Sequence, residues 1–256
     1  MMGSFSHLKE KCSGCEKEEV NYTKEHVFPQ WLILKTNTDK TRINWFNETK
    51  LPALSCTIPL CEECNKIFGK ELEGPVSKLF EDIESFKGLS DNEAELLVRW
   101  MWKISGLFWA AACPQGKYTE KYTLRERVLS PIDEIRGDII IALSLIDNID
   151  LSYGDLPLGL DALCEIDAIF VAGVFSKIAI IISLAGFEEV IPENYSIYHL
   201  ESVRQENIET KVLFPKQGFK NDSEAVYVTK TIGELLAVVH DELAIELYRR
   251  KINGVV

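Results

Sequence analysis

CSGC at residues 12–15 and CEEC at residues 61–64 are two C-x2-C pairs in one chain. Such a pair turns tightly enough for both thiolates to bind one ion, and two pairs together form a tetrahedral zinc site. The predicted ligands of this structural Zn²⁺ are Cys12, Cys15, Cys61 and Cys64. Because so small a metal-bound unit draws much of its folding energy from the metal, we expect zinc removal to unfold residues 12–73.

The 45 residues between the two cysteine pairs contain a candidate catalytic motif. EHVFP at residues 25–29 places the carboxylate of Glu25 beside the imidazole of His26, and Pro29 is expected to end a strand just after them. Asn65 directly follows the second cysteine pair and opens a predicted helix that runs to Glu73. A base that can deprotonate water, beside oxygen ligands for a hard cation, is what a one-metal phosphodiesterase requires.

The order of these motifs is similar to that of the HNH endonuclease family. The matching residues are EHVFPQWL at 25–32, CEECN at 61–65 and LE at 72–73, followed by a weaker likeness in RWMWK at 99–103. The resemblance covers about residues 12–73. It implies two strands and a helix around a metal ion, a ββα-metal fold, and hydrolysis of nucleic-acid phosphodiester bonds.

The resemblance also implies roles for individual residues. His26 is the expected general base, and Glu25 and Asn65 are the expected ligands of a catalytic Mg²⁺ or Mn²⁺ ion, with Glu73 as a further ligand candidate. The residues alone leave other interpretations open. Glu25 could orient the imidazole instead, Asn65 could be only a helix cap, and Glu73 could form only a surface ion pair.

The chain departs from the HNH pattern at the middle asparagine, which that family places shortly before the second cysteine pair. Cys56 stands there with Thr57 beside it, and the asparagines available nearby are Asn44 and Asn47. Either the loop geometry differs from that of the family or another group orients His26.

Five basic residues are candidates for nucleic-acid contact. Lys35, Lys40 and Arg42 belong to a polar stretch that in this fold class can lie along a phosphate backbone, although a solvated loop is the alternative. Arg99 and Lys103 lie four residues apart on a predicted buried helix, where they need partners or access to the site.

Charge is unevenly distributed along the chain, whose net charge is -12. Acidity opposes binding to phosphate backbones. However, residues 1–73 carry ten Lys and Arg against eleven Asp and Glu, whereas residues 74–256 carry eighteen against twenty-nine. This distribution favours a nuclease that a partner brings to its target. The cysteine content and the absence of an apolar leader in the first eleven residues predict a cytoplasmic protein.

The predicted fold class is α+β, in three parts. They are a zinc-bound HNH domain over residues 1–75, a helical spine over 76–112, and a C-terminal domain over 113–256 with a mostly antiparallel sheet and helices. The apolar stretch 168–187 contains one charge, Lys177, and is more typical of two buried strands joined by a turn than of a membrane span.

Two capping-box patterns predict long helices. Ser90 begins one that is expected to run to about Ala112, and Thr231 begins a terminal helix expected to reach about Ile252. A strand is expected just before the latter, over residues 225–229, and GP at 74–75 is expected to stop or bend the first helix.

The sequence thus predicts a metal-dependent endonuclease with DNA as the favoured substrate. HNH proteins of this type occur in bacterial antiphage systems, so the resemblance adds an effector role with a protein partner or as a homo-oligomer. The alternative is a zinc-stabilised module that binds nucleic acid or protein without hydrolysis, favoured by the missing asparagine and the acidic second half. The residues do not distinguish DNA from RNA.

Overall fold

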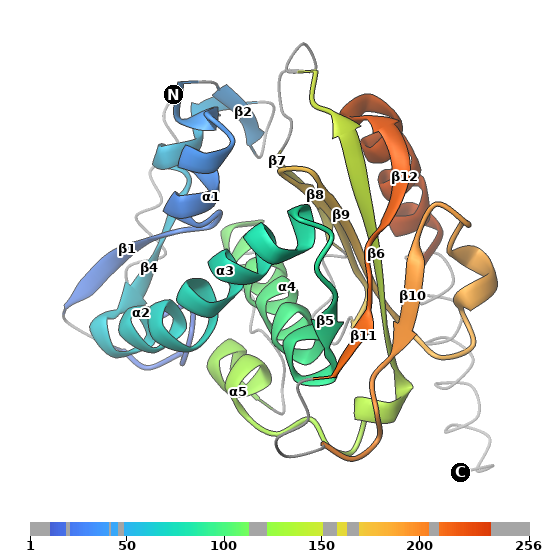
Figure 1. Cartoon of the computed structure of the whole chain (residues 1–256). Coiled ribbons are helices and arrows are strands. Elements are labelled where there is room, and N and C mark those ends of the chain that lie inside the picture. The colour runs from blue at the N-terminus through green and yellow to red at the C-terminus, as the bar shows by residue number, and fades with distance from the viewer. Residues whose placement is uncertain are drawn as a thin grey trace, which may run out of the picture.

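The computed structural model describes residues 11–18, 21–40, 42–45, 49–112, 122–150, 158–162, 169–204 and 210–236. It is an α+β fold with a mostly antiparallel sheet and helices, as predicted (Figure 1). The strands are β1 Tyr22–His26, β2 Arg42–Trp45, β3 Thr49–Pro52, β4 Thr57–Cys61, β5 Leu89–Ser90, β6 Ile139–Asn148, β7 Leu158–Ala162, β8 Val171–Phe175, β9 Ile178–Leu184, β10 Ser196–His199, β11 Lys211–Leu213 and β12 Lys216–Asn221. The labelled helices are α1 Gln30–Lys35, α2 Glu62–Phe68, α3 Gly74–Glu84, α4 Asp91–Ala112 and α5 Leu124–Leu129.

Strands β1 and β4 form an antiparallel ribbon that carries both the EH motif and the second cysteine pair. Tyr22 lies opposite Cys61 at one end and His26 lies opposite Thr57 at the other. Helix α2 follows β4 without a connecting loop, so the ribbon and the helix share the cysteine pair CEEC. β1 ends at His26, before Pro29, as the sequence predicted.

The helix that begins at Glu62 continues past the Gly74-Pro75 pair to Glu84, so the expected stop does not occur. A proline inside a helix lacks an amide hydrogen and crowds the carbonyl four residues back. Here a π-helix over Gly69–Glu73 precedes it, and the amide of Gly74 bonds the carbonyl of Gly69. This wider turn accommodates Pro75 without ending the helix.

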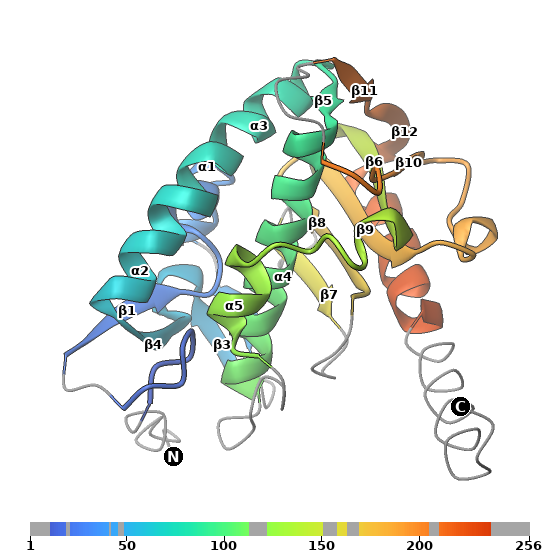
Figure 2. The ribbon, with the colours of Figure 1, turned by 90° about the horizontal axis from the view of Figure 1, so that it is seen from below.

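Helix α4 begins where the Ser90 capping box predicted. The Ser90 amide donates to the Glu93 carboxylate at 2.6 Å, and the Glu93 amide donates back to Ser90 Oγ at 3.4 Å. Apolar side chains around most of the helix are buried, among them Trp100 and Ile104. α4 lies between α3 and the sheet (Figure 2).

The six-stranded sheet has the order β10-β6-β9-β8-β7, and β12 pairs with β6 in parallel. Alternate residues of β6 face two cores: Ile141 packs in the core that includes α4, and Ile140 packs in the core of the opposite face. β8 and β9 form the hairpin predicted for the apolar stretch 168–187. Within the described ranges, none of the helices combines the length and apolar character needed to span a bilayer.

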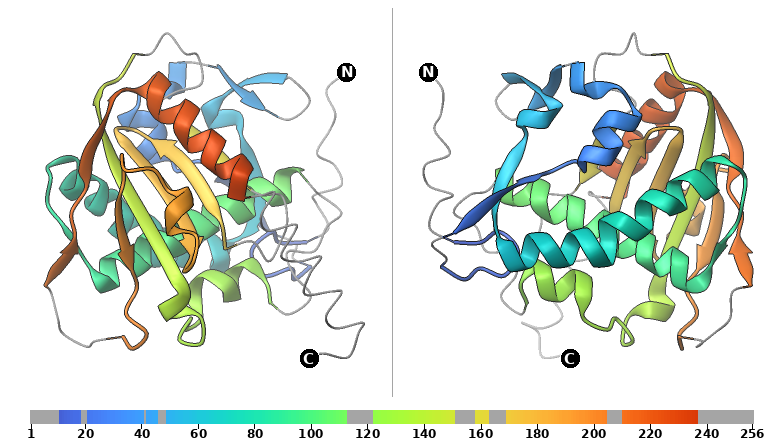
Figure 3. Two further views of the ribbon diagram at one scale, coloured as in Figure 1. Left: turned by 90° about the vertical axis from the view of Figure 1, so that its right-hand side faces the viewer. Right: turned by 60° about the vertical axis from the view of Figure 1, so that its left-hand side comes forward.

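The prediction for the C-terminal region was wrong at residues 225–229, which are helical. A helix covers residues 222–236 and lies on the face of the sheet away from α4 (Figure 3). The helix is capped earlier than predicted, by Asn221 and not by Thr231. Asn221 Oδ1 accepts from the Glu224 amide at 2.9 Å. The hydroxyl of Thr231 instead bonds the Tyr227 carbonyl inside the helix at 2.8 Å. The predicted end near Ile252 lies outside the described residues.

One buried core joins the three predicted parts of the chain. The same apolar cluster contains Cys64 of α2, Trp100 of α4 and Ile180 of β9. The cysteine pairs therefore belong to the same continuous core as the spine and the sheet.

Candidate metal centre

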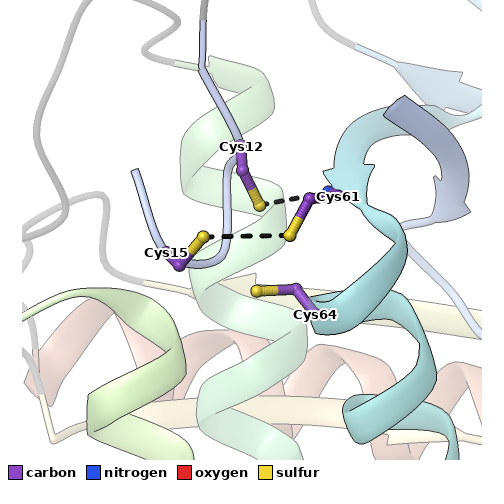
Figure 4. Close-up of side chains that lie close together, drawn as sticks. All are labelled: Cys12, Cys15, Cys61 and Cys64. Atoms are coloured by element: carbon purple, nitrogen blue, oxygen red, sulfur yellow. Dashed lines mark hydrogen bonds between the residues drawn. The ribbon is translucent and has the colours of Figure 1, made fainter. Parts of the chain in front are cut away.

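The four cysteines of the two C-x2-C pairs converge, as the sequence predicted. Their Sγ atoms all lie within 4.8 Å of one another, and Cys15 Sγ is 3.9 Å from Cys61 Sγ (Figure 4). A tetrahedral site with Zn–S bonds of about 2.3 Å requires sulfur separations of about 3.8 Å. The cluster can therefore hold a structural metal ion such as Zn²⁺.

Local backbone geometry supports the cluster. The amides of Gly14 and Cys61 donate to Cys12 Sγ at 3.3 and 3.2 Å, which stabilises a thiolate at that position. A Cβ atom on Gly14 would lie 3.1 Å from Cys64 Sγ. The first cysteine pair thus approaches the second so closely that a side chain at position 14 is crowded.

The pKa values of Cys12 and Cys64 are shifted in opposite directions. A hydrogen bond from the Cys64 side chain is the largest cause that lowers the pKa of Cys12, to about 4. The same hydrogen bond raises the pKa of Cys64, and burial raises it further. Because neighbouring thiolates repel one another, a bound cation is what allows all four to be deprotonated together.

Arg125 lies beside the cluster although sequence reasoning did not single it out. Its amide donates to the Gly14 carbonyl at 2.8 Å, and its guanidinium donates to Glu63 Oε1 at 2.7 Å. The hydrogen bond to Glu63 is the main cause that raises the pKa of Arg125. Arg125 thus ties α5 to the loop of the first cysteine pair and to the helix of the second, across a sequence distance that no local pattern bridges.

Glu25 and Glu73 are brought together by Lys103. The Lys103 Nζ lies 2.6 Å from Glu25 Oε1 and 2.7 Å from Glu73 Oε1, and its side chain is 0% exposed. Burial acts to lower the pKa of Lys103, but the charges of Glu73 and Glu25 and their hydrogen bonds outweigh it, so the pKa is raised. Lys103 therefore has no surface with which to contact a nucleic acid, and Glu73 does not form the surface ion pair considered from sequence.

The other predicted nucleic-acid contacts lie in different surroundings. Arg99 is buried, and its guanidinium donates to Glu95 and to the carbonyls of Val128 and Ser130. Lys35 pairs with Glu84 at 2.8 Å on the surface. Arg42 is exposed at the start of β2, and Lys40 ends a short 3-10 turn.

Asn65 is held in one orientation by strand β1. Its Nδ2 donates to Thr23 Oγ1 at 2.7 Å, and Thr23 Oγ1 donates to the Leu60 carbonyl at 3.0 Å. Because a hydroxyl has a single hydrogen, Thr23 accepts from Asn65, so the amide nitrogen faces Thr23 and Oδ1 faces elsewhere. α2 begins at Glu62, so Asn65 lies within the helix and is not its cap.

His26 points away from Glu25, because successive residues of a strand face opposite sides. Thr23 and Glu25 share the side of β1 that faces α2 and α4, as the contacts of Asn65 and Lys103 show. The His26 side chain is half-buried and has no hydrogen bond or ion pair within the described ranges. In those ranges the four cysteines are the only group of three or more Cys, His, Asp or Glu close enough to hold a metal.

Cys56 stands where the middle asparagine was expected, and its thiol is buried. The Val27 amide donates to the Cys56 carbonyl at 2.9 Å, next to His26. Burial raises the pKa of the Cys56 thiol to about 12, so it stays protonated. Asn44 lies in β2 opposite Lys50, and Asn47 lies outside the described residues.

Comparisons of the chain with protein-family models, with curated proteins and with solved structures found no match. The likeness to HNH endonucleases therefore rests on the sequence motifs alone.

Proposed function

We propose that the protein is a zinc-stabilised, divalent-metal-dependent endonuclease of the HNH type. The observation that carries the proposal is a pair of oxygens without hydrogen-bond partners in the described ranges, Glu25 Oε2 and Asn65 Oδ1. Glu25 and the Thr23 that holds Asn65 lie on one side of β1, and His26 ends the strand. Carboxylate and amide oxygens are ligands that Mg²⁺ and Mn²⁺ favour.

In this proposal His26 accepts the proton of a water molecule that attacks the phosphorus atom of a phosphodiester. The bond from phosphorus to the leaving 3′ oxygen breaks as the new bond forms. A Mg²⁺ or Mn²⁺ ion bound by Glu25 and Asn65 would neutralise the charge that develops on these oxygens. Lys103 and Thr23 hold the two ligand side chains in place.

The surface chemistry supports delivery of the nuclease by a partner. Arg99 and Lys103 are buried in ion pairs and Lys35 is paired with Glu84, so these cations add little to a basic surface. The chain also carries its excess of acidic residues after residue 73. An effector that cuts DNA within a defence assembly, and binds DNA weakly alone, fits this distribution.

A binding module without hydrolysis is the second candidate. Two observations favour it. The ammonium of Lys103 already binds Glu25 Oε1, and the side chains of Glu25 and His26 face opposite sides of β1. In that case the ribbon and α2 would be a scaffold that the zinc holds together.

Plasmid nicking with Mg²⁺ or Mn²⁺ tests the proposed base. We expect His26→Ala to lower the rate by about 10²-fold or more, the range for loss of a general base. His199→Ala is the matched control, because His199 is a surface residue paired with Glu188. Zinc content must equal that of the wild type in both variants. Equal rates in wild type and His26→Ala would rule out His26 as the base.

A titration with Mn²⁺ separates the two candidate functions even if the isolated protein does not cut. A nuclease of this type should bind one Mn²⁺ weakly in addition to its zinc, and Glu25→Gln should weaken that binding. A binding module should retain its zinc and take up no second ion.

A further inference from the structure

The ammonium of Lys103 lies at the centre of a buried polar cluster, on the helix that the sequence predicted to be buried. It donates to Glu25 on β1 and to Glu73 at the end of the π-helix. The rings of Trp31 and Trp100 close the other side of Glu73, and each also packs against Phe80, with centroid separations of 5.0 and 5.2 Å. Lysine suits this place because its compact charge has three donors.

The two carboxylates of the cluster differ in how fully they are bonded. Glu73 Oε2 accepts from Trp31 Nε1 at 2.9 Å and from Trp100 Nε1 at 3.3 Å, while Oε1 accepts from Lys103. Both oxygens of Glu73 are therefore engaged, and a metal ion could bind this carboxylate only by displacing these donors.

Glu25 is bonded through one oxygen only. Oε1 accepts from Lys103, whereas Oε2 has no hydrogen-bond partner within the described ranges, and 14% of the side chain is exposed. The cluster contains two carboxylates and one ammonium, so it retains one negative charge that no side chain of the cluster neutralises. Glu25 Oε2 is the oxygen of the cluster that is left to carry this negative charge.

We infer that Lys103 is a positioning residue: it fixes Glu25 so that Oε2 remains available to a divalent cation, and Glu73 anchors Lys103 without binding the cation itself. This inference rests on the proposed function and refines its ligand set, because it removes Glu73 from the candidate ligands. Residues that orient a metal ligand commonly affect metal affinity by 10–100-fold.

The decisive variant removes the Lys103 ammonium that holds Glu25, without changing the net charge of the cluster. Lys103→Met combined with Glu73→Gln deletes one positive and one negative charge, so the net charge of the cluster stays at one negative. If charge alone governs cation binding, the Mn²⁺ dissociation constant stays the same. If Lys103 positions Glu25, the dissociation constant rises by about 10-fold or more. If Lys103 instead competes with the ion for Glu25, it falls.

The measurement is a Mn²⁺ titration of the full-length, zinc-loaded protein, followed by the electron paramagnetic resonance signal of free Mn²⁺. Zinc content and the melting temperature show whether each variant is folded. A weaker Mn²⁺ affinity in the folded double variant supports the inference, and an unchanged or tighter affinity overturns it.

A second variant decides the question if the double variant does not fold. Trp31→Phe keeps every charge and an aromatic ring against Phe80, but removes one donor from Glu73. We expect a smaller, measurable loss of Mn²⁺ affinity, and an affinity equal to that of the wild type would overturn the inference. A wild type that binds no Mn²⁺ beside its zinc would refute the proposed function itself, before any variant is compared.

Discussion

The side-chain amide of Asn65 donates a hydrogen bond of 2.7 Å to Thr23 Oγ1, which links helix α2 to strand β1. The Thr23 hydroxyl in turn donates a hydrogen bond to the Leu60 carbonyl on β4. Three elements of the ribbon and its helix are thus joined through one hydroxyl. This link determines which way the Asn65 amide faces.

Replacement of that hydroxyl tests the orientation of Asn65. Thr23→Val keeps the shape of the side chain but removes the acceptor of the Asn65 amide. We expect Mn²⁺ affinity to fall by about 10-fold, as for other residues that orient a ligand, and stability to fall by about 1–3 kcal/mol. Thr23→Ser retains the hydroxyl and should restore most of the affinity. Equal Mn²⁺ affinity in Thr23→Val and wild type would argue against Asn65 as a ligand.

Loss of one cysteine of the cluster should remove the metal. Cys64→Ser is expected to lose stoichiometric zinc. If the free energy of unfolding falls by about 5 kcal/mol, the melting temperature should fall by about 10–20 °C. Because Cys64 packs in the same core as Trp100, hydrogen exchange should increase in α4 as well as in the ribbon. Cys56→Ala is the control, since Cys56 is equally buried but lies outside the cluster. A Cys64→Ser protein with full zinc content would disprove the ligand set.

Two glycines should respond in opposite ways to alanine. A Cβ atom at position 14 would lie 3.1 Å from Cys64 Sγ and 3.2 Å from Leu60 Cδ2, so Gly14→Ala should destabilise the protein by about 1–3 kcal/mol. At Gly69, which is exposed and helical, a Cβ atom meets nothing within 4 Å. Gly69→Ala should therefore stabilise by about 0.5–1 kcal/mol. Denaturant unfolding measures both, and the opposite order would contradict the packing described for the first cysteine pair.

Glu95 should make stability depend on pH on the acid side. Burial acts to raise the pKa of Glu95, but hydrogen bonds from Arg136 and Arg204 and the charge of Arg99 outweigh it, so the pKa is lowered from 4.5. A carboxyl whose pKa is lower in the folded state stabilises the fold above the unfolded pKa, and this contribution is lost as pH falls through the folded pKa.

We accordingly expect Glu95→Gln to cost about 3–5 kcal/mol near pH 7, the range for removing one partner of a buried ion pair. The difference in unfolding free energy between Glu95→Gln and wild type should become smaller below about pH 4.5. Zinc release in acid affects both proteins alike, so the difference between their unfolding free energies isolates Glu95. Glu71→Gln, at an exposed carboxylate paired with Lys70, should change little at any pH. A constant difference across the acid range would contradict this assignment.

Patterns that act over a few residues predicted the elements well. The capping box at Ser90, the β8–β9 hairpin around Lys177 and the end of β1 at His26 all appear in the structure. Each depends on neighbouring residues, whose preferences survive in most tertiary settings. The region around residues 225–229 failed because β-branched residues there favour a strand locally, while packing of Ala225 and Ile232 on the sheet favours a helix.

The sequence by itself determined the convergence of the four cysteines, because the geometry of C-x2-C turns and the preference of zinc for four thiolates leave few other arrangements. It also predicted that Glu25 and His26 end a strand, and there they face opposite sides of β1. Only the tertiary structure decided the partner of the Glu25 carboxylate. Lys103 lies 78 residues from Glu25 in the chain, and no local preference places an ammonium there. Its burial follows from the packing of α4 against the ribbon, where a charged side chain must find opposite charges because it has lost its water.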